Sequence, residues 1–145
     1  MTIQKLTIPA DIEQDLIKHA QSLAPIESCG YLAGKNNVVE KFYPMTNIDN
    51  SPEHFSFDPK EQFSVVKAAR KDGHDLLSVY HSHPESPARL SEEDIRLFND
   101  PNPVYIIVSL ADKSPVLKGF KVKKETEHDI EINQVKLVIS EGGKS

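Results

Sequence analysis

Two histidines, a serine and an aspartate lie close together in this sequence of 145 residues, as His81, His83, Ser91 and Asp94. Two imidazoles and one carboxylate would give a metal three protein ligands and leave a fourth position open. Structural zinc sites are usually closed by four protein ligands, whereas catalytic zinc sites keep a position for water or substrate. The spacing therefore predicts a catalytic metal centre in a hydrolytic enzyme.

The segment that carries the two histidines has the pattern of a strand. The run Asp75–His81 is apolar and rich in residues that favour β-structure. Residues two apart on a strand share a face, so the side chains of His81 and His83 can point the same way. Pro84 and Pro87 follow, and proline cannot donate a hydrogen bond to a neighbouring strand. The two imidazoles are therefore expected at the end of a strand.

The segment from Ser91 to Asp94 has the pattern of a helix start, with Ser91 as N-cap and Asp94 near the third helical position. A carboxylate on the first turn can face the strand end, which would bring the three ligands to one point. The alternative is an ordinary capping pair beside two polar surface histidines. The complete spacing disfavours that alternative, because a chance match has a probability on the order of one in a thousand.

The same residues resemble the motif of the JAMM (MPN-plus) metalloproteases. The resemblance rests on His81-Ser82-His83-Pro84, then Ser91 and Asp94, with Glu27 far upstream. It extends to Pro25–Leu32 around the glutamate, to Asn47, and to Ser51-Pro52 and Phe57-Asp58-Pro59. These segments span most of positions 6–122, and the compact length is similar to the small prokaryotic branch of that family.

The resemblance implies a single zinc ion per chain, held by His81, His83 and Asp94. It also implies that Glu27 is the catalytic acid and base and that Ser91 stabilises an oxyanion. All five positions carry the residue type of the motif, which favours an active member. The implied JAB/MPN fold is α/β, with a mixed curved β-sheet flanked by helices, similar to cytidine deaminases. Without the resemblance, Glu27 would be interpreted as a solvated loop carboxylate.

Other metal chemistries fit less well. His83-Pro84-Glu85 matches part of the zinc deaminase motif, but that motif also needs two cysteines and the chain has only Cys29. The His-Glu-x-x-His pattern of thermolysin-like proteases is absent. A non-haem iron site also uses two histidines and a carboxylate, so iron stays open as an alternative. Zinc is favoured because Ser91 and Glu27 have natural roles in hydrolysis.

The resemblance implies cleavage of bonds that follow the C-terminal Gly-Gly of ubiquitin-like proteins. For the small prokaryotic branch it implies a β-grasp sulfur-carrier protein as the substrate, and this is the function that we predict. One alternative is an isopeptidase that removes ubiquitin-like modifiers from lysines. A second alternative, from a different class, is a non-catalytic MPN scaffold or interaction module.

Composition agrees with a globular protein that forms one domain, expected over 1–140 with a flexible tail at 141–145. The net charge of −5 argues against a nucleic-acid-binding protein. The sequence has no apolar run long enough to span a membrane and no secretory signal pattern. The lone Cys29 excludes an internal disulfide, which favours a reducing cytoplasm. We interpret Cys29 and Tyr80 as core residues and His54 as an exposed loop histidine.

The remaining pattern predicts a series of strands and helices in one mixed sheet. Helices are expected at 10–23, at 58–73 with Glu61 in a capping box, and from 91 to Pro101. Strands are expected at 2–8, 29–34, 38–45, 75–81, 104–108, 116–122 and 130–139. The continuous apolar run at 104–108 predicts a central strand that is buried on both faces.

Overall fold

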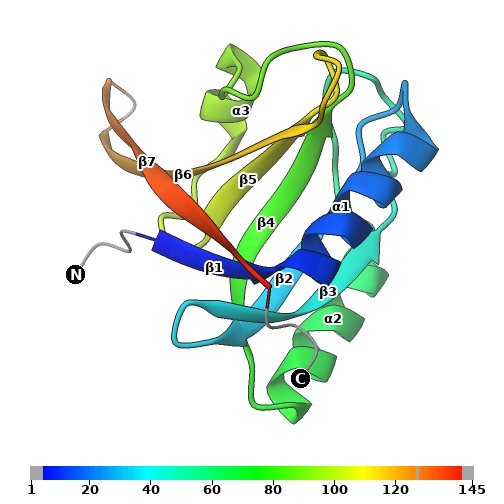
Figure 1. Cartoon of the computed structure of the whole chain (residues 1–145). Coiled ribbons are helices and arrows are strands. Elements are labelled where there is room, and N and C mark those ends of the chain that lie inside the picture. The colour runs from blue at the N-terminus through cyan, green and yellow to red at the C-terminus, as the bar shows by residue number, and fades with distance from the viewer. Residues whose placement is uncertain (1–4, 127, 142–145) are drawn as a thin grey trace.

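The computed structural model describes residues 5–126 and 128–141 of the chain (Figure 1). Its elements follow the order β1 (Lys5–Pro9), α1 (Ala10–Leu23), β2 (Cys29–Lys35), β3 (Val38–Met45), α2 (Pro59–Lys71), β4 (Asp75–His83), α3 (Glu92–Leu97), β5 (Val104–Ser109), β6 (Val116–Thr126) and β7 (Asp129–Ser140). Every predicted element is present among the described residues, and residues 2–4 of the first predicted strand lie outside them. Residues 142–145 of the predicted tail lie outside the described residues. Among the described residues, no helix is both long enough and apolar enough to cross a bilayer.

The seven strands form one mixed sheet in the order β1-β3-β2-β4-β5-β6-β7, which closes on itself. β1 closes it by pairing in parallel with both β3 and β7, the latter over Lys5↔Lys136 to Pro9↔Ser140. β4 and β5 are also parallel, and the other neighbours are antiparallel. The predicted mixed curved sheet is confirmed. Its closure was not expected, because closure depends on how the two ends of the chain pair.

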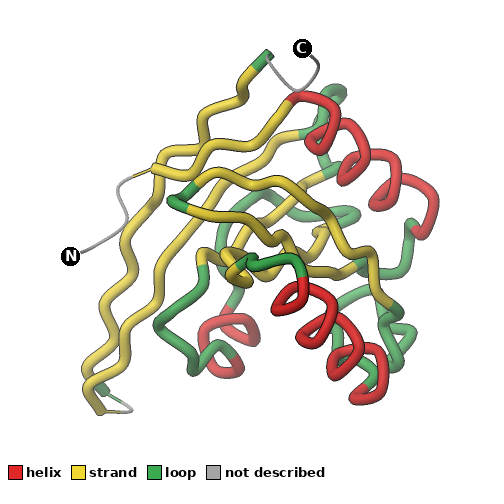
Figure 2. The backbone as a smooth tube through the Cα atoms, turned by 90° about the horizontal axis from the view of Figure 1, so that it is seen from below, coloured by secondary structure: helices red, strands yellow, loops and turns green. Residues whose placement is uncertain are grey.

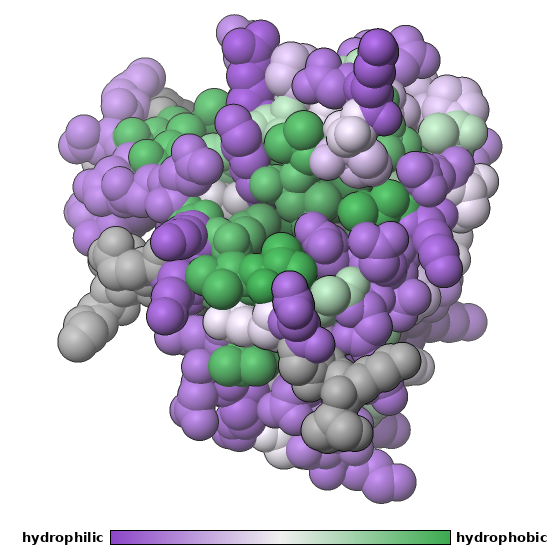
Figure 3. Space-filling model, viewed as in Figure 1, coloured by the Kyte–Doolittle hydropathy of each residue, from purple (hydrophilic) through white to green (hydrophobic). Residues whose placement is uncertain are grey.

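The sheet separates two apolar layers, because side chains alternate across each strand. On one face, Ile12 and Leu16 of α1 pack against a cluster that includes Tyr80 and Ile106. On the other face, α2 covers a second cluster, to which Val79 contributes. Figure 2 shows the strands passing between these two helices. Polar side chains cover most of the face in Figure 3, around a band of apolar side chains.

Two local predictions at helix ends were wrong. Glu61 does not complete a capping box: its carboxylate oxygens accept hydrogen bonds from the backbone N–H and the hydroxyl of Thr46, both at 2.8 Å. This contact ties α2 to the end of β3 instead, while Asp58 alone caps the helix. The third helix ends at Leu97, not at Pro101, because Phe98 turns into extended backbone and stacks on Tyr105 at a centroid distance of 4.1 Å.

The strands at the centre of the sheet are buried along much of their length. β5 is buried along its whole length, as its apolar run predicts. It pairs in parallel with β4, from Ser78↔Val104 to His83↔Ser109. β4 continues through His83 and ends just before Pro84, the proline that was predicted to stop it. The two histidines therefore lie at the C-terminal end of a strand in the centre of the sheet.

Candidate functional site

The three predicted metal ligands converge where β4 ends and α3 begins. The Nε2 atoms of His81 and His83 lie 3.1 Å apart. Asp94 approaches both: Oδ1 lies 3.2 Å from His81 Nε2, and Oδ2 lies 3.1 Å from His83 Nε2. All three residues are buried. One nitrogen from each imidazole and the carboxylate thus form a compact triangle.

The triangle fits a zinc ion. Ligand atoms about 2.0–2.1 Å from a tetrahedral ion lie about 3.3 Å from one another, close to the observed spacing. Two imidazole nitrogens and one carboxylate oxygen are also the donors that catalytic zinc uses. Burial lowers the pKa of His81, which favours the neutral imidazole that a metal requires. Among the described residues, His81, His83 and Asp94 are the one group with this arrangement.

The two histidines are held in place by different means. His83 Nδ1 lies 2.9 Å from the carbonyl oxygen of Pro87, so a proton on Nδ1 leaves Nε2 free to face the triangle. His81 Nδ1 has no hydrogen-bond partner among the described residues. The His81 ring instead stacks on Phe55 at 5.0 Å and meets the edge of Phe98 at 5.5 Å. Packing therefore orients His81, whereas a hydrogen bond orients His83.

Ser91 and Asp94 form a reciprocal capping box at the start of α3. Ser91 Oγ accepts a hydrogen bond from the Asp94 N–H, and Asp94 Oδ2 accepts one from the Ser91 N–H, both at 3.0 Å. Burial would raise the pKa of Asp94, but its contacts with His81 and His83 hold it well below the usual range. Capping uses the oxygen of Ser91 and leaves its hydroxyl hydrogen free to donate elsewhere.

Glu27 lies just before β2 and is only 3% exposed, so it is not the solvated loop carboxylate of the alternative interpretation. Its Oε1 has no hydrogen-bond partner among the described residues. Burial raises the pKa of Glu27 to about 8. His83 lowers this pKa and Asp94 raises it, so Glu27 is electrostatically coupled to the triangle. A carboxyl group with a pKa near neutrality can both accept and donate a proton.

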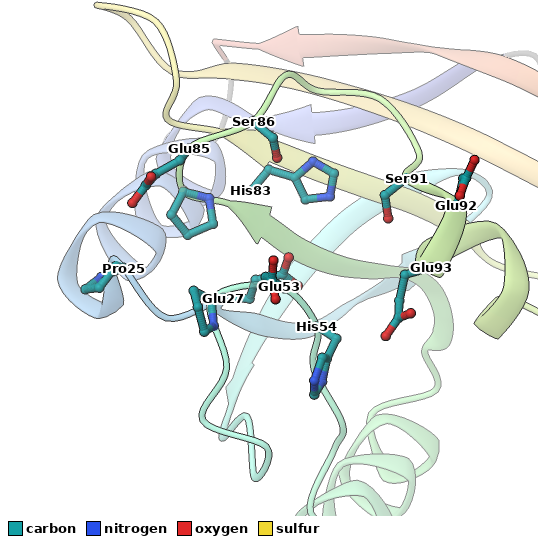
Figure 4. Close-up of a pocket in the computed structure, with 12 residues that line it drawn as sticks. Pro25, Glu27, Glu53, His54, His83, Glu85, Ser86, Ser91, Glu92 and Glu93 are labelled. Carbon is teal, nitrogen blue, oxygen red and sulfur yellow. The ribbon is translucent and has the colours of Figure 1, made fainter.

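Glu27, His83 and Ser91 line one open cleft of about 760 Å³. Figure 4 shows their side chains around it. Three of the five predicted site residues thus line the cleft, and the other two, His81 and Asp94, lie 3.1 Å from Nε2 of His83. His54 borders the cleft from the loop after β3, and its Nδ1 lies 2.9 Å from Asp49. Cys29 is fully buried and belongs to the core, as predicted.

Asn47 joins the loop after β3 to the backbone of Glu27. Its side-chain amide donates to the carbonyl oxygens of Glu27 at 3.0 Å and His54 at 2.9 Å. Its Oδ1 accepts from the backbone N–H groups of Asp49 and Ser56. The sequence singles out Asn47 only through the family resemblance, because no local pattern shows that the backbone of a residue twenty positions away bonds to its side chain.

We expect Asn47→Ala to lower the free energy of unfolding by about 2–3 kcal/mol, because it leaves several buried polar groups without partners. Chemical denaturation of the zinc-free protein measures this loss. Asn133→Ala is the matched control, because that amide is exposed and donates to the exposed Glu131. Equal stability of the two variants would contradict the role of Asn47.

A second set of hydrogen bonds lies behind the site, on the face that α1 covers. Ser82 Oγ accepts from the Ser28 N–H at 2.8 Å, and the Ser82 N–H donates to the Ser28 carbonyl at 3.0 Å. The Ser28 hydroxyl also bonds to the Tyr80 hydroxyl, which lies 2.9 Å from His19 Nδ1. These bonds link the neighbour of Glu27 to the residue between the two histidines. Tyr80 is buried in the core, as predicted.

The raised pKa of Glu27 has a consequence for the stability of the metal-free protein. Its ordinary value is 4.5, so between pH 4.5 and pH 8 the unfolded chain has lost a proton that the folded chain keeps. Stability must therefore fall as the pH rises through this window. We expect Glu27→Gln to match the wild type at pH 4 and to be more stable by about 2–4 kcal/mol at pH 8.5.

Urea denaturation with a chelator present, at several pH values, tests this expectation. Glu131→Gln is the matched control, because Glu131 is exposed on β7. A stability difference between Glu27→Gln and wild type that does not change with pH would contradict the raised pKa.

Comparison with known proteins gives consistent matches. The family model for prokaryotic homologues of the JAB domain matches residues 9–122. A CysO-cysteine peptidase from Mycobacterium tuberculosis is 34% identical over 113 residues, which is 77% of each chain. A desampylase from Haloferax volcanii is 34% identical over 116 residues, covering 75% of this chain and 84% of the desampylase.

Two solved structures have the same fold. The solution structure of a protein from Desulfitobacterium hafniense has a TM-score of 0.83 and 40% identity, covering 94% of this chain and 93% of that one. The crystal structure of a JAB1/MPN domain protein from Archaeoglobus fulgidus has a TM-score of 0.59 over 92% of this chain and 98% of its own length. At 21% identity, that second likeness concerns the fold alone.

Proposed function

Because the chain belongs to the family of prokaryotic JAB-domain homologues, we propose that it is a zinc-dependent metallopeptidase of the JAMM type. Its proposed reaction is hydrolysis of the bond that follows the C-terminal Gly-Gly of a ubiquitin-like β-grasp sulfur-carrier protein. The observation that carries the proposal is the buried triangle of His81, His83 and Asp94, with spacings of 3.1–3.2 Å. Glu27 and Ser91 line the cleft above it.

In this proposal His81, His83 and Asp94 hold a single zinc ion. Bound zinc supplies Lewis acidity, which acidifies a water molecule and polarises a carbonyl group. Glu27 takes the proton from the attacking water and passes it to the departing amine. Its burial and its pKa of about 8 suit both transfers.

Ser91 is the proposed donor to the oxyanion that develops on the scissile carbonyl. Its hydroxyl oxygen accepts the Asp94 N–H, and this bond holds the side chain at the edge of the cleft. The hydroxyl hydrogen is then available when negative charge appears, which is when such a donor contributes most. The N-cap role and the catalytic role therefore use different parts of one hydroxyl group.

The names of the relatives support the substrate class. One relative is called a CysO-cysteine peptidase, another a desampylase, and a third, from Thermus thermophilus, a probable TtuB-protein conjugate cleaving protease. The last two names also favour the isopeptidase alternative, in which the leaving group is a lysine of a target protein. The peptidase names argue against a non-catalytic scaffold and support assignment of the chain as a hydrolase.

Intact-mass spectrometry tests the proposed function. A β-grasp sulfur-carrier protein, extended by several residues beyond Gly-Gly, is incubated with the zinc-loaded chain. We expect one product that ends at Gly-Gly, and we expect none when a chelator has removed the metal. A carrier of unchanged mass with zinc fully bound, together with an unchanged lysine conjugate, would overturn the proposal in favour of the scaffold.

A further inference from the structure

The cleft beside the proposed zinc site is lined by acidic side chains. Besides Glu27, its wall includes Glu53, Glu85, Glu92 and Glu93, and none of the described residues that line it is a lysine or arginine. The chain has 17 lysines and arginines, so their exclusion from this wall is local. Figure 4 shows the acidic side chains on several sides of the cleft.

The four outer glutamates come from three separate segments. Glu53 belongs to the loop after β3, Glu85 to the loop after β4, and the other two to the first turn of α3. Glu53, Glu85 and Glu92 are exposed, while Glu93 is paired with Arg96 at 2.6 Å. Glu53, Glu85 and Glu92 have no ion-pair partner among the described residues, and the space that they line is large enough for several residues of a peptide.

Glu27 provides a second and independent sign that this cleft receives a hydrogen-bond donor. The residue is 3% exposed and lines the cleft, and its Oε1 has no partner among the described residues. A buried polar atom without a partner is costly, so such an atom is usually satisfied by water or by a ligand. The groups that suit a carboxylate are N–H donors and, above all, ammonium groups.

Hydrolysis of an amide bond releases a carboxylate on one side and an amine on the other. Water adds to the carbonyl carbon, the C–N bond breaks, and the amine leaves with a proton. At neutral pH that amine takes a second proton and becomes an ammonium ion. Glutamates around a leaving amine would attract this cation and repel a carboxylate.

We propose that the Glu53–Glu85–Glu92 wall binds the leaving side of the substrate and selects a lysine that lies within a basic segment of a target protein. The inference rests on the proposed function and narrows its substrate class. When the substrate is a lysine conjugate, the leaving group is the side-chain amine of that lysine. The carboxyl group of the lysine carries no charge, because it forms a peptide bond in the target protein. A single amino acid leaves with a free carboxylate beside its new ammonium group, and this carboxylate would lie among the glutamates.

A set of matched conjugates tests the inference. One carrier is joined through its C-terminal glycine to the lysine side chain of three peptides, in which that lysine is flanked by arginines, by serines or by glutamates. A fourth substrate carries a single C-terminal alanine, and a fifth carries the amide of that alanine. Rates are measured by intact mass with the zinc-loaded protein, at low and at high salt.

We expect kcat/KM at low salt to be at least about tenfold higher for the arginine-flanked than for the glutamate-flanked conjugate, with a smaller ratio at high salt. The carrier that ends in alanine amide should be cleaved faster than the carrier that ends in alanine with a free carboxylate. Replacing both Glu53 and Glu85 by glutamine should reduce the ratio to about twofold, whereas Glu131→Gln on β7 should leave it unchanged.

The outcomes separate this inference from the proposed function. Cleavage of all five substrates at similar rates, independent of salt, would overturn the inference and leave the proposed function standing. Cleavage of none of them would overturn the proposed function. Faster cleavage of the carrier that ends in alanine than of the arginine-flanked conjugate would also overturn the inference, because the free carboxylate of that alanine would lie among the glutamates.

Discussion

Glu27→Gln is expected to lower kcat for Gly-Gly cleavage by about 10²–10⁴-fold, while zinc stays bound. Glutamine keeps the size of the side chain and the backbone bonds of residue 27 to Ser51 and Asn47, but it cannot take a proton from water. Stopped reactions followed by intact mass give the rate, and elemental analysis of the same sample gives the zinc content. KM should change little, because the loss concerns the transition state.

The control for this variant is Glu131→Gln, which changes the same chemical group on the exposed face of β7. It should have wild-type activity. If Glu27→Gln with full zinc occupancy cleaves the carrier at a rate near that of the wild type, Glu27 is not the acid and base of the reaction.

The second large effect concerns the metal. We expect Asp94→Asn to weaken zinc binding by at least about 100-fold and to abolish hydrolysis, because the site loses its only anionic ligand. Asparagine can still accept the Ser91 N–H through its side-chain oxygen, so the start of α3 should remain folded. Competition with a chromophoric chelator measures the affinity, and circular dichroism checks the fold.

Glu92→Gln is the matched control for zinc binding, since it removes a charge from the same helical turn without touching the triangle. It should bind zinc as tightly as the wild type. Zinc bound with wild-type affinity by Asp94→Asn would contradict the assignment of Asp94 as a ligand. Metal analysis of the wild-type protein after purification also separates zinc from the iron alternative.

Sequence alone could predict that the two histidines meet Ser91 and Asp94, because local secondary-structure geometry determines the positions of all four side chains. The two-residue period of a strand puts His81 and His83 on one face, and a capping box places Asp94 over the strand end. These relations involve residues within one strand and one helical turn. They depend little on the rest of the fold.

The burial of Glu27 could not be predicted in this way, because it depends on tertiary contacts. Asn47 and Ser51 hold the Glu27 backbone from a loop that lies about twenty residues further along the chain. The failed capping box of Glu61 has a similar cause, since Thr46 offers that carboxylate two hydrogen bonds that the helix cannot match. The closure of the sheet by β1 likewise needs partners from β3 and β7.

Gly-Gly cleavage should require both the zinc triangle and Glu27, and this requirement decides the proposed mechanism. The decisive experiment is single-turnover cleavage of an extended β-grasp carrier, with wild type, Glu27→Gln and Asp94→Asn compared at known zinc content. We expect rapid release of the extension by wild type alone, with zinc retained in Glu27→Gln and lost from Asp94→Asn. Equal cleavage by all three proteins, or by wild type stripped of its metal, would contradict this requirement.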